Sequence, residues 1–390
     1  MSQLKDIRVL DLGTVITAPL AGMMLADLGA DVIKVEKPDG GDTFRSFNGG
    51  LYSPYFLAFN RNKRSLTLDL RKPEGRSVME KLLAAADVMI ENYRPGVMDR
   101  LGMGTARLKE LNPRLIHATI TGFGKDGPYA DRPAFDSVGQ ALSGMANLFL
   151  DANDPRLRGP TIVDNVTGMN LAYGVLGALF ERERTGVARR VEVNMLESAM
   201  GFMPDVFANF TQTGAAIDSY SRVAASQSYA CRCADGKMVA VHLSSQEKFW
   251  HGLTAALERP DLASDPRFAT RMDRFKHYQA ACAALAGAFA RRERAYWLPR
   301  LEANDVPFAP IHAIPDVLED PQVQHLGSFY DRSHPTQGRQ RALHRPVTMD
   351  GRREEQLHPP PLLGEHTDEV LKEIGYDAAG IAALRGNGVV

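Results

Sequence analysis

The sequence has few cysteines and almost no net charge. It contains three cysteines in 390 residues, and its formal net charge is −1. A small, odd number of cysteines argues against a disulfide framework and predicts a reducing compartment such as the cytoplasm. A charge near zero gives no reason to expect nucleic acid or an anionic membrane surface as a partner. No signal-peptide pattern is found at the N-terminus, and no apolar run reaches the ~20 residues of a membrane span, so no membrane association is expected.

Motifs that mark several common enzyme classes are also missing. The ten histidines form no H-E-x-x-H pattern, and Cys231-Arg-Cys233 is followed by no further ligands at zinc spacing, so no metal site is expected. The sequence has no P-loop and no G-x-S-x-G elbow. The turn at 13–18, after the first predicted strand, lacks G-x-G-x-x-G, which argues against a nicotinamide site. A carboxylate, a lone serine or a lone cysteine is left as the nucleophile, and carboxylates can react through anhydride or ester intermediates.

What the sequence does contain is a regular α/β pattern. Short β-rich runs alternate with helical segments, which predicts a parallel sheet. The predicted strands are 6–13, 31–36, 65–70, 87–91, 115–121 and 189–194. A stretch rich in Ser, Ala and Gly at 214–228 marks a domain boundary, and Asp235-Gly236 predicts a hairpin in a smaller α+β domain. We therefore predict a large first domain over 1–213 and a small domain over 225–325.

Polar and small residues follow several of the predicted strands. These residues are Val15, Lys37, Arg71, Asn92 and Gly122. In open α/β sheets, ligands bind outside the carboxyl ends of the strands. This edge is therefore predicted to bind one elongated, anionic ligand, because phosphates favour such cations. Each basic residue taken alone is more often a solvated surface charge.

Asp164 stands where a long apolar helix is predicted to begin. Gly159 and Pro160 interrupt the preceding structure, and the segment 169–180 carries no charge, which predicts a buried helix that ends near Gly186. A carboxylate just before such a helix faces unpaired N–H groups and the positive end of the helix dipole, and both favour its ionised form. Asp is also a common N-cap, so position alone leaves both a structural and a nucleophilic role open.

Seven stretches spread over the chain carry a family resemblance. They are 9–12, 30–36, 62–65 with 68–70, 91–102, 111–116, 122–124 with 127–129, and 361–371. Through them the chain resembles the class III CoA-transferases, a family that includes formyl-CoA transferase, carnitine CoA-transferase and α-methylacyl-CoA racemase. The resemblance implies a Rossmann-like large domain built from both chain ends, so that 326–390 returns to it, a smaller α+β domain, and a homodimer of two interlocked subunits.

The resemblance also implies roles for individual residues. It places the nucleophilic aspartate at Asp164. It places the contacts to coenzyme A at Val15, Lys37, Leu68, Arg71, Asn92, Tyr93 and Arg100. Coenzyme A and its acyl thioesters are then substrates, and no permanently bound cofactor is implied.

Two departures from the family pattern bear on the substrate. Phe135 stands where the racemases have a histidine, and phenylalanine cannot move a proton. The glycine run of formyl-CoA transferase is absent between Gly214 and Ser245. We predict a transferase that moves CoA from an acyl-CoA donor to a carboxylic acid through an aspartyl anhydride and thioester. An acyl-CoA racemase or epimerase is the alternative, ahead of a nicotinamide-dependent oxidoreductase or a non-catalytic CoA-binding protein.

The substrate side of the site is predicted from neighbouring residues. Phe135, Gly122 and Gly124 are expected to line the acyl site, with the two glycines as candidate donors to an oxyanion. Arg156 and Arg158 lie just upstream of Asp164 and are candidates to bind a second carboxylate of a dicarboxylic acid such as succinate.

Overall fold

The computed structural model describes residues 3–50, 52–151, 153–353 and 357–390. Its chain divides into two compact units. One comprises Met1–Ala146, Leu157–Pro204 and Ser328–Val390, and the other comprises Asn147–Arg156 and Asp205–Gly327. The domain boundaries predicted from the sequence are 1–213, 225–325 and 326–390, and this division stays a prediction.

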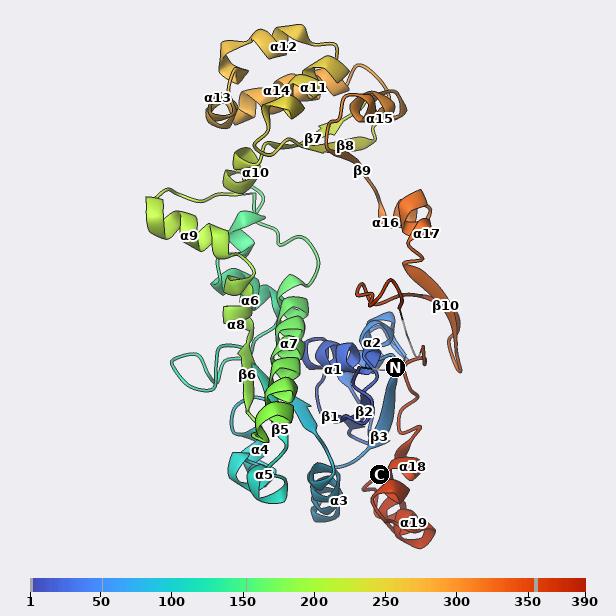
Figure 1. The fold of residues 1–390 in the computed structure, drawn as a ribbon. Helices are drawn as coiled ribbons and strands as arrows, with labels where there is room; N and C mark the ends of the chain where they lie inside the picture. Colours follow the sequence, from blue (N-terminus) through green and yellow to red (C-terminus); the bar gives the residue numbers. More distant parts are fainter. Residues whose placement is uncertain (1–2, 51, 152, 354–356) are drawn as a thin grey trace. The chain divides into compact units, whose positions relative to one another are not determined.

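The first unit is built on a six-stranded parallel sheet, which confirms the predicted α/β class. The strands are β1 (Arg8–Asp11), β2 (Asp31–Glu36), β3 (Lys63–Thr67), β4 (Val88–Glu91), β5 (Ile116–Thr121) and β6 (Val191–Asn194), in the order β3-β2-β1-β4-β5-β6 (Figure 1). The strand order reverses between β1 and β4, and ligands of open α/β sheets bind at such a point.

Alternation along the strands gives the sheet two different faces. Leu10, Ile33 and Leu66 point to an apolar face. The helices that cover it are α3 (Pro73–Ala84), α5 (Thr105–Leu111), α18 (Thr367–Glu373) and α19 (Ala378–Gly386). Side chains one residue further along, including Lys34 and Asp11, point to the opposite face, which is buried but charged.

That charged face is covered by α1 (Thr17–Asp27) and α7 (Ile162–Thr185). A Cβ on Gly22 of α1 would lie 2.9 Å from Asp11 Oδ2, and a Cβ on Gly168 of α7 would lie 2.6 Å from Thr17 O. Only glycine allows approaches this close, so these two residues set how tightly α1 packs on β1 and on α7.

The C-terminal segment packs beside β3. His366 N donates to Ser65 O, and Asp69 N donates to Val389 O. The hairpin of β10 (Phe329–His334) and β11 (Gly338–Leu343) belongs to the same unit. The remaining elements of this unit are η1 (Thr43–Ser46), α2 (Pro54–Phe59), α4 (Val97–Arg100), α6 (Asp136–Leu142) and α8 (Met195–Gly201).

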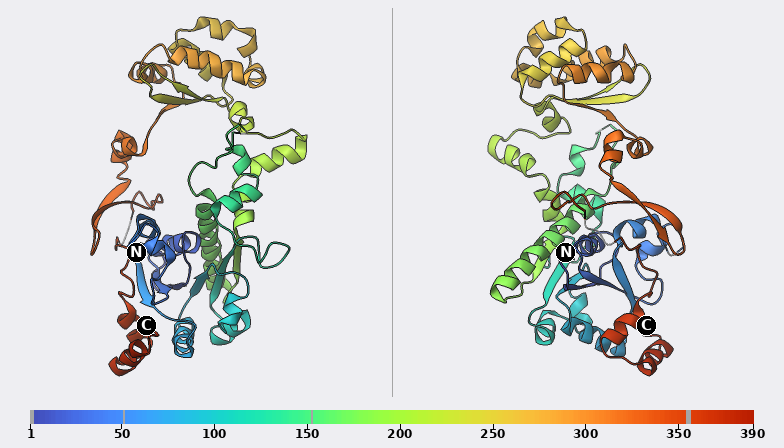
Figure 2. Two further views of the ribbon diagram at one scale, coloured as in Figure 1. Left: turned by 180° about the vertical axis from the view of Figure 1, so that it is seen from behind. Right: turned by 45° about the vertical axis from the view of Figure 1, so that its right-hand side comes forward.

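The second unit has an antiparallel sheet of β7 (Ser228–Arg232), β8 (Met238–His242) and β9 (Phe308–Ile311). The β7–β8 hairpin turns at Asp235-Gly236, as predicted, with Gly236 at φ 77°. The helices packed against this sheet include α11 (Glu247–Ala256), α14 (Tyr278–Phe289) and α15 (Arg294–Ala303) (Figure 2, yellow and orange). The other elements are α9 (Pro204–Thr213), α10 (Ser221–Ala225), α12 (Pro260–Ser264), η3 (Pro266–Phe268), α13 (Arg271–Lys276), α16 (Ile314–Leu318) and α17 (Pro321–His325). Along the sequence, η2 (Ala146–Leu148) contains the point where the chain passes from the first unit to the second.

Cys231 and Cys233 are buried in the core of the second unit. They lie two residues apart in and just after β7, so both side chains face inward. Burial raises the pKa of Cys231 to about 12. A thiol in this state is a packing residue rather than a reactive group.

Candidate active site

A cavity of about 190 Å³ opens at the reversal of strand order. Its walls come from the loop after β1, the loop after β4, the segment 120–122 at the end of β5, and the segment 130–135 before α6. Asp164 lies in the lining as well, and of the described residues that line the cavity it is the one carboxylate. The cavity therefore combines backbone from several loops with a single acidic side chain.

Asp164 is the third residue of α7, not a residue before it. The expected start of this helix was therefore too late, because Thr161, directly after the Gly159-Pro160 break, already stands at the N-cap. The predicted end at Gly186 is confirmed by its left-handed φ of 74°. Asp164 is 7% exposed, and none of the described cations forms an ion pair with it.

The N-terminus of α7 is capped by a different carboxylate. Asp136 Oδ1 accepts from Val163 N at 2.8 Å and from Asp164 N at 3.1 Å. The free N–H groups that were expected to favour ionised Asp164 are thus occupied by Asp136. Burial and the nearby charge of Asp136 raise the pKa of Asp164 to about 7. The expectation that the start of α7 favours the ionised form of Asp164 is therefore wrong.

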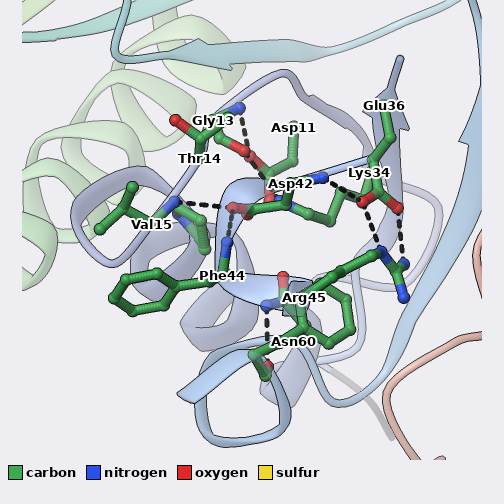
Figure 3. A network of polar contacts seen from close by, with 12 residues as sticks. Asp11, Gly13, Thr14, Val15, Lys34, Glu36, Asp42, Phe44, Arg45 and Asn60 are labelled. Atoms are coloured by element: carbon green, nitrogen blue, oxygen red, sulfur yellow. Dashed lines mark hydrogen bonds and ion pairs between the residues drawn. The ribbon is translucent and has the colours of Figure 1, made fainter. Parts of the chain in front are cut away.

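The loop after β1 enters the cavity in a strained conformation. Val15 has φ 69°, which a β-branched residue rarely adopts. Val15 N donates to Asp42 Oδ1, and Lys34 Nζ donates to Gly13 O (Figure 3). Thr14 N donates to Asn92 Oδ1, and Asn92 Nδ2 donates to Thr14 O. Hydrogen bonds with Asp42, Lys34 and Asn92 therefore hold the turn in place.

Behind this turn lies a buried network of six charged side chains. Figure 3 labels five of them: Asp11, Lys34, Glu36, Asp42 and Arg45. Its ion pairs are Lys63–Asp11 at 2.8 Å, Lys34–Asp42 at 2.9 Å and Arg45–Glu36 at 2.7 Å. Burial by itself would raise the pKa of Asp11, but Lys63 and Lys34 outweigh it and the pKa is lowered. Three cations balance three carboxylates, so the network carries no net charge.

The structure brings six of the predicted site residues together. Val15, Asn92, Tyr93, Gly122, Phe135 and Asp164 all line the cavity. Burial, and then Glu91, raise the pKa of Tyr93 to about 12, so its phenol stays neutral. Phe135 is 66% exposed and directly precedes α6.

Five other predicted residues lie outside the cavity lining. Lys37 and Leu68 directly follow the ends of β2 and β3, on the edge of the sheet where the cavity opens. Arg71 is bound through two nitrogens to Asp69, yet its side chain is 84% exposed. Arg100 ends α4 with an exposed side chain. Gly124 N already donates to Thr121 Oγ1, so it is a poor oxyanion donor.

Two further arginines of the sequence stand apart from the cavity lining. Arg156 is paired with Asp154 at 2.6 Å and belongs to the second unit. Arg158 does not line the cavity.

Sequence reasoning missed Arg132 and Asp136 as parts of the site. Arg132 lines the cavity beside Arg94, and its guanidinium lies 3.9 Å from the centre of the Tyr129 ring. Asp136 follows Phe135 directly, but its role depends on a contact with backbone 27 and 28 residues away. The only local signal for Asp136 in the sequence was its position directly after Phe135.

Comparison with known proteins decides the family. The model of CoA-transferase family III matches residues 4–367. The chain belongs to CoA-transferase family III. As a class III CoA-transferase, it moves CoA between carboxylic acids and takes CoA thioesters as substrates.

Several relatives of this family III enzyme are similar over its whole length. It is 33% identical to succinyl-CoA:glutarate CoA-transferase from Mus musculus, over 100% of this chain and 91% of the relative. It is 30% identical to formyl-CoA:oxalate CoA-transferase from Rhodopseudomonas palustris (strain BisA53), over 99% and 97%.

Solved structures give the same result for the fold of the family III enzyme. Rv3272 from M. tuberculosis has a TM-score of 0.84 and 33% identity, with 95% of this chain and 99% of that chain covered. A CAIB/BAIF family protein from Brucella suis has a TM-score of 0.83 and 31% identity over 95% and 99%. None of the described helices is long and apolar enough to cross a membrane.

Proposed function

We propose that Asp164 is the covalent nucleophile of CoA transfer in this enzyme. The observation that carries the proposal is its place as the one carboxylate among the described cavity residues, at the reversal of strand order. An Asp164 oxygen attacks the thioester carbonyl of the donor, the C–S bond breaks, and CoA thiolate leaves a mixed anhydride. The thiolate then attacks the aspartyl carbonyl, which releases the donor acid and forms an aspartyl-CoA thioester.

The second half of the reaction repeats these steps with the acceptor. Its carboxylate attacks the aspartyl thioester, CoA thiolate leaves again, and a new anhydride forms. Attack of the thiolate on the acceptor's carbonyl gives the product thioester and restores the Asp164 carboxylate. Gly122, in the wall of the cavity, is the remaining glycine candidate for oxyanion binding, and burial of the site protects the anhydride from water.

CoA is proposed to lie along the carboxyl edge of the sheet. Val15, Asn92 and Tyr93 would contact it inside the cavity, and Lys37, Leu68, Arg71 and Arg100 beyond it. Lys37, Arg71 and Arg100 are exposed cations, which suits the phosphates of CoA.

The acids exchanged are proposed to be dicarboxylates such as succinate. The similarity to succinyl-CoA:glutarate and formyl-CoA:oxalate transferases supports this choice. Arg94 and Arg132 lie in the cavity and form no ion pair within the described residues, so either is placed to bind a second carboxylate. Arg156, already paired with Asp154, is a weaker candidate for this role.

We also propose that the enzyme is a cytoplasmic homodimer. The α7 helix, expected to be buried, exposes Met169, Tyr173 and Phe180 at 50%, 81% and 65%. The α9 helix buries none of its residues. Such apolar surfaces are typical of subunit interfaces.

The racemase alternative is not favoured by the cavity. Phe135 supplies no base, and Asp164 is the one acidic side chain in the described lining. Exchange of the α-hydrogen of an acyl-CoA in D₂O would reopen this alternative.

Intact-protein mass spectrometry with succinyl-CoA, followed by hydroxylamine trapping, tests the proposed nucleophile. We expect a hydroxamate on the peptide that carries Asp164 and a loss of transfer of at least about a thousandfold in Asp164→Asn. Glu302→Gln is the matched control, because it changes an exposed carboxylate of the second unit in the same way. Retention of most activity in Asp164→Asn would refute the assignment.

A further inference from the structure

A second, larger cavity of about 650 Å³ lies in the first unit, away from Asp164. It is formed by α1, α2 and the β10–β11 hairpin. Much of its wall is apolar and comes from Met23, Leu57, Phe59, Phe329 and Leu343. Its volume falls in the range of small-molecule sites, which is about 300–1,000 Å³.

One half-buried cation in this wall has no acidic partner. Arg332 donates from Nε to Gln340 Oε1 at 3.1 Å, from Nη2 to Leu57 O at 3.0 Å, and from Nη1 to Tyr330 Oη at 3.5 Å. Within the described parts of the chain, none of the carboxylates forms an ion pair with it. Burial lowers the pKa of Arg332, Tyr330 raises it by a smaller amount, and the charge of Arg61 adds to the lowering.

The other cations in this wall do have acidic partners. Arg61 is paired with Asp27 at 2.5 Å, and Arg341 with Asp331 at 3.3 Å. The uncompensated charge is therefore localised at Arg332. A buried charge of this kind is stabilised by a bound anion.

We propose that this cavity binds a small monocarboxylic acid with an apolar body, whose carboxylate pairs with Arg332. Three of the five guanidinium N–H groups are used inside the protein, which leaves one on each terminal nitrogen. Two such donors match the two oxygens of one carboxylate. The apolar part of the wall favours a hydrocarbon chain. The site is distinct from the acyl-transfer cavity and does not rest on the proposed nucleophile.

Calorimetric titration with octanoate tests this site. The full-length Asp164→Asn protein is used, so that no transfer chemistry contributes heat. We expect saturable binding of one octanoate per chain, and at least tenfold weaker binding after Arg332→Gln in the same background. Arg339→Gln is the control, because Arg339 lies on the same hairpin, is exposed and is paired with Asp331. It should leave the affinity unchanged.

A second variant guards against a folding defect in Arg332→Gln. Ala342→Phe keeps Arg332 but fills space in the cavity wall, and it should also weaken octanoate binding at least tenfold. If the Asp164→Asn protein binds octanoate with the same affinity with and without Arg332→Gln, the proposal is overturned. Absence of saturable binding at millimolar octanoate, as when a second copy of the chain covers the cavity, would overturn it too.

Discussion

Two buried carboxylates of the first unit behave in opposite ways. Asp11 is 0% exposed and Asp164 is 7% exposed, so both have left water. Asp11 lies 2.8 Å from Lys63, and its pKa is lowered. Asp164 has another carboxylate nearby, Asp136, and its pKa is raised to about 7. Burial is thus common to both, and the sign of the neighbouring charge decides whether the pKa of the carboxylate is lowered or raised.

The largest effect is expected where the paired network is broken. Glu36→Leu leaves Arg45 buried without its carboxylate, which lies 2.7 Å away in the native protein. We expect the free energy of unfolding to fall by about 3–5 kcal/mol. Urea unfolding followed by circular dichroism measures the change. Glu181→Gln, which removes an exposed pair with Arg189, should leave the midpoint unchanged.

Substitution of Asp164 is expected to have a smaller effect of opposite sign, an increase in the free energy of unfolding. Because its folded-state pKa of about 7 exceeds the ordinary 3.8, ionisation of Asp164 destabilises the fold as the pH rises between these values. Asp164→Asn should therefore be more stable than the native protein at pH 8, on the order of 2–4 kcal/mol at ~1.4 kcal/mol per pKa unit. Urea unfolding without CoA at pH 8 and pH 5 measures this. A gain that is not smaller at pH 5 would contradict the assigned pKa.

The smallest effect concerns the influence of Asp136 on Asp164. Asp136→Asn keeps a side-chain oxygen that can accept from Val163 N and Asp164 N, but it removes the charge. With Asp164 as the proposed nucleophile, we expect the acid limb of kcat/KM near pH 7 in the native enzyme, and it should move to lower pH by roughly one unit in this variant. Asp126→Asn, at an exposed position, is the control. An unchanged limb would show that burial alone raises the pKa of Asp164.

The strands and the edge of the sheet that carries the site could be predicted from local sequence. Runs such as 31–36 and 115–121 are short and β-rich, and the alternation of such runs with helical segments predicted the parallel sheet. Asn92 and Gly122 followed from their places at strand ends. The helices α8 and α9 are separate, because Pro204 begins a new helix.

Contacts between distant residues could not be predicted in this way. Lys63 and Asp11 are 52 positions apart, and neither carries a local signal for an ion pair. The capping of α7 by Asp136 is of the same kind, and it reversed the expected ionisation of Asp164. A charged residue in a strand usually indicates that this face of the sheet is exposed to solvent. Here, charged residues at alternate positions of β1, β2 and β3 lie on a face that helices cover.

The turn at Val15 has a kinetic consequence. Its left-handed backbone is fixed by hydrogen bonds with Asp42, Lys34 and Asn92. The strain is therefore offset by bonds within the fold, and binding of CoA at this turn, as proposed, requires no rearrangement of its backbone. Association of CoA with this part of the site should then proceed in a single step, with an observed rate that rises linearly with CoA concentration and reaches no plateau set by a slow rearrangement of the turn.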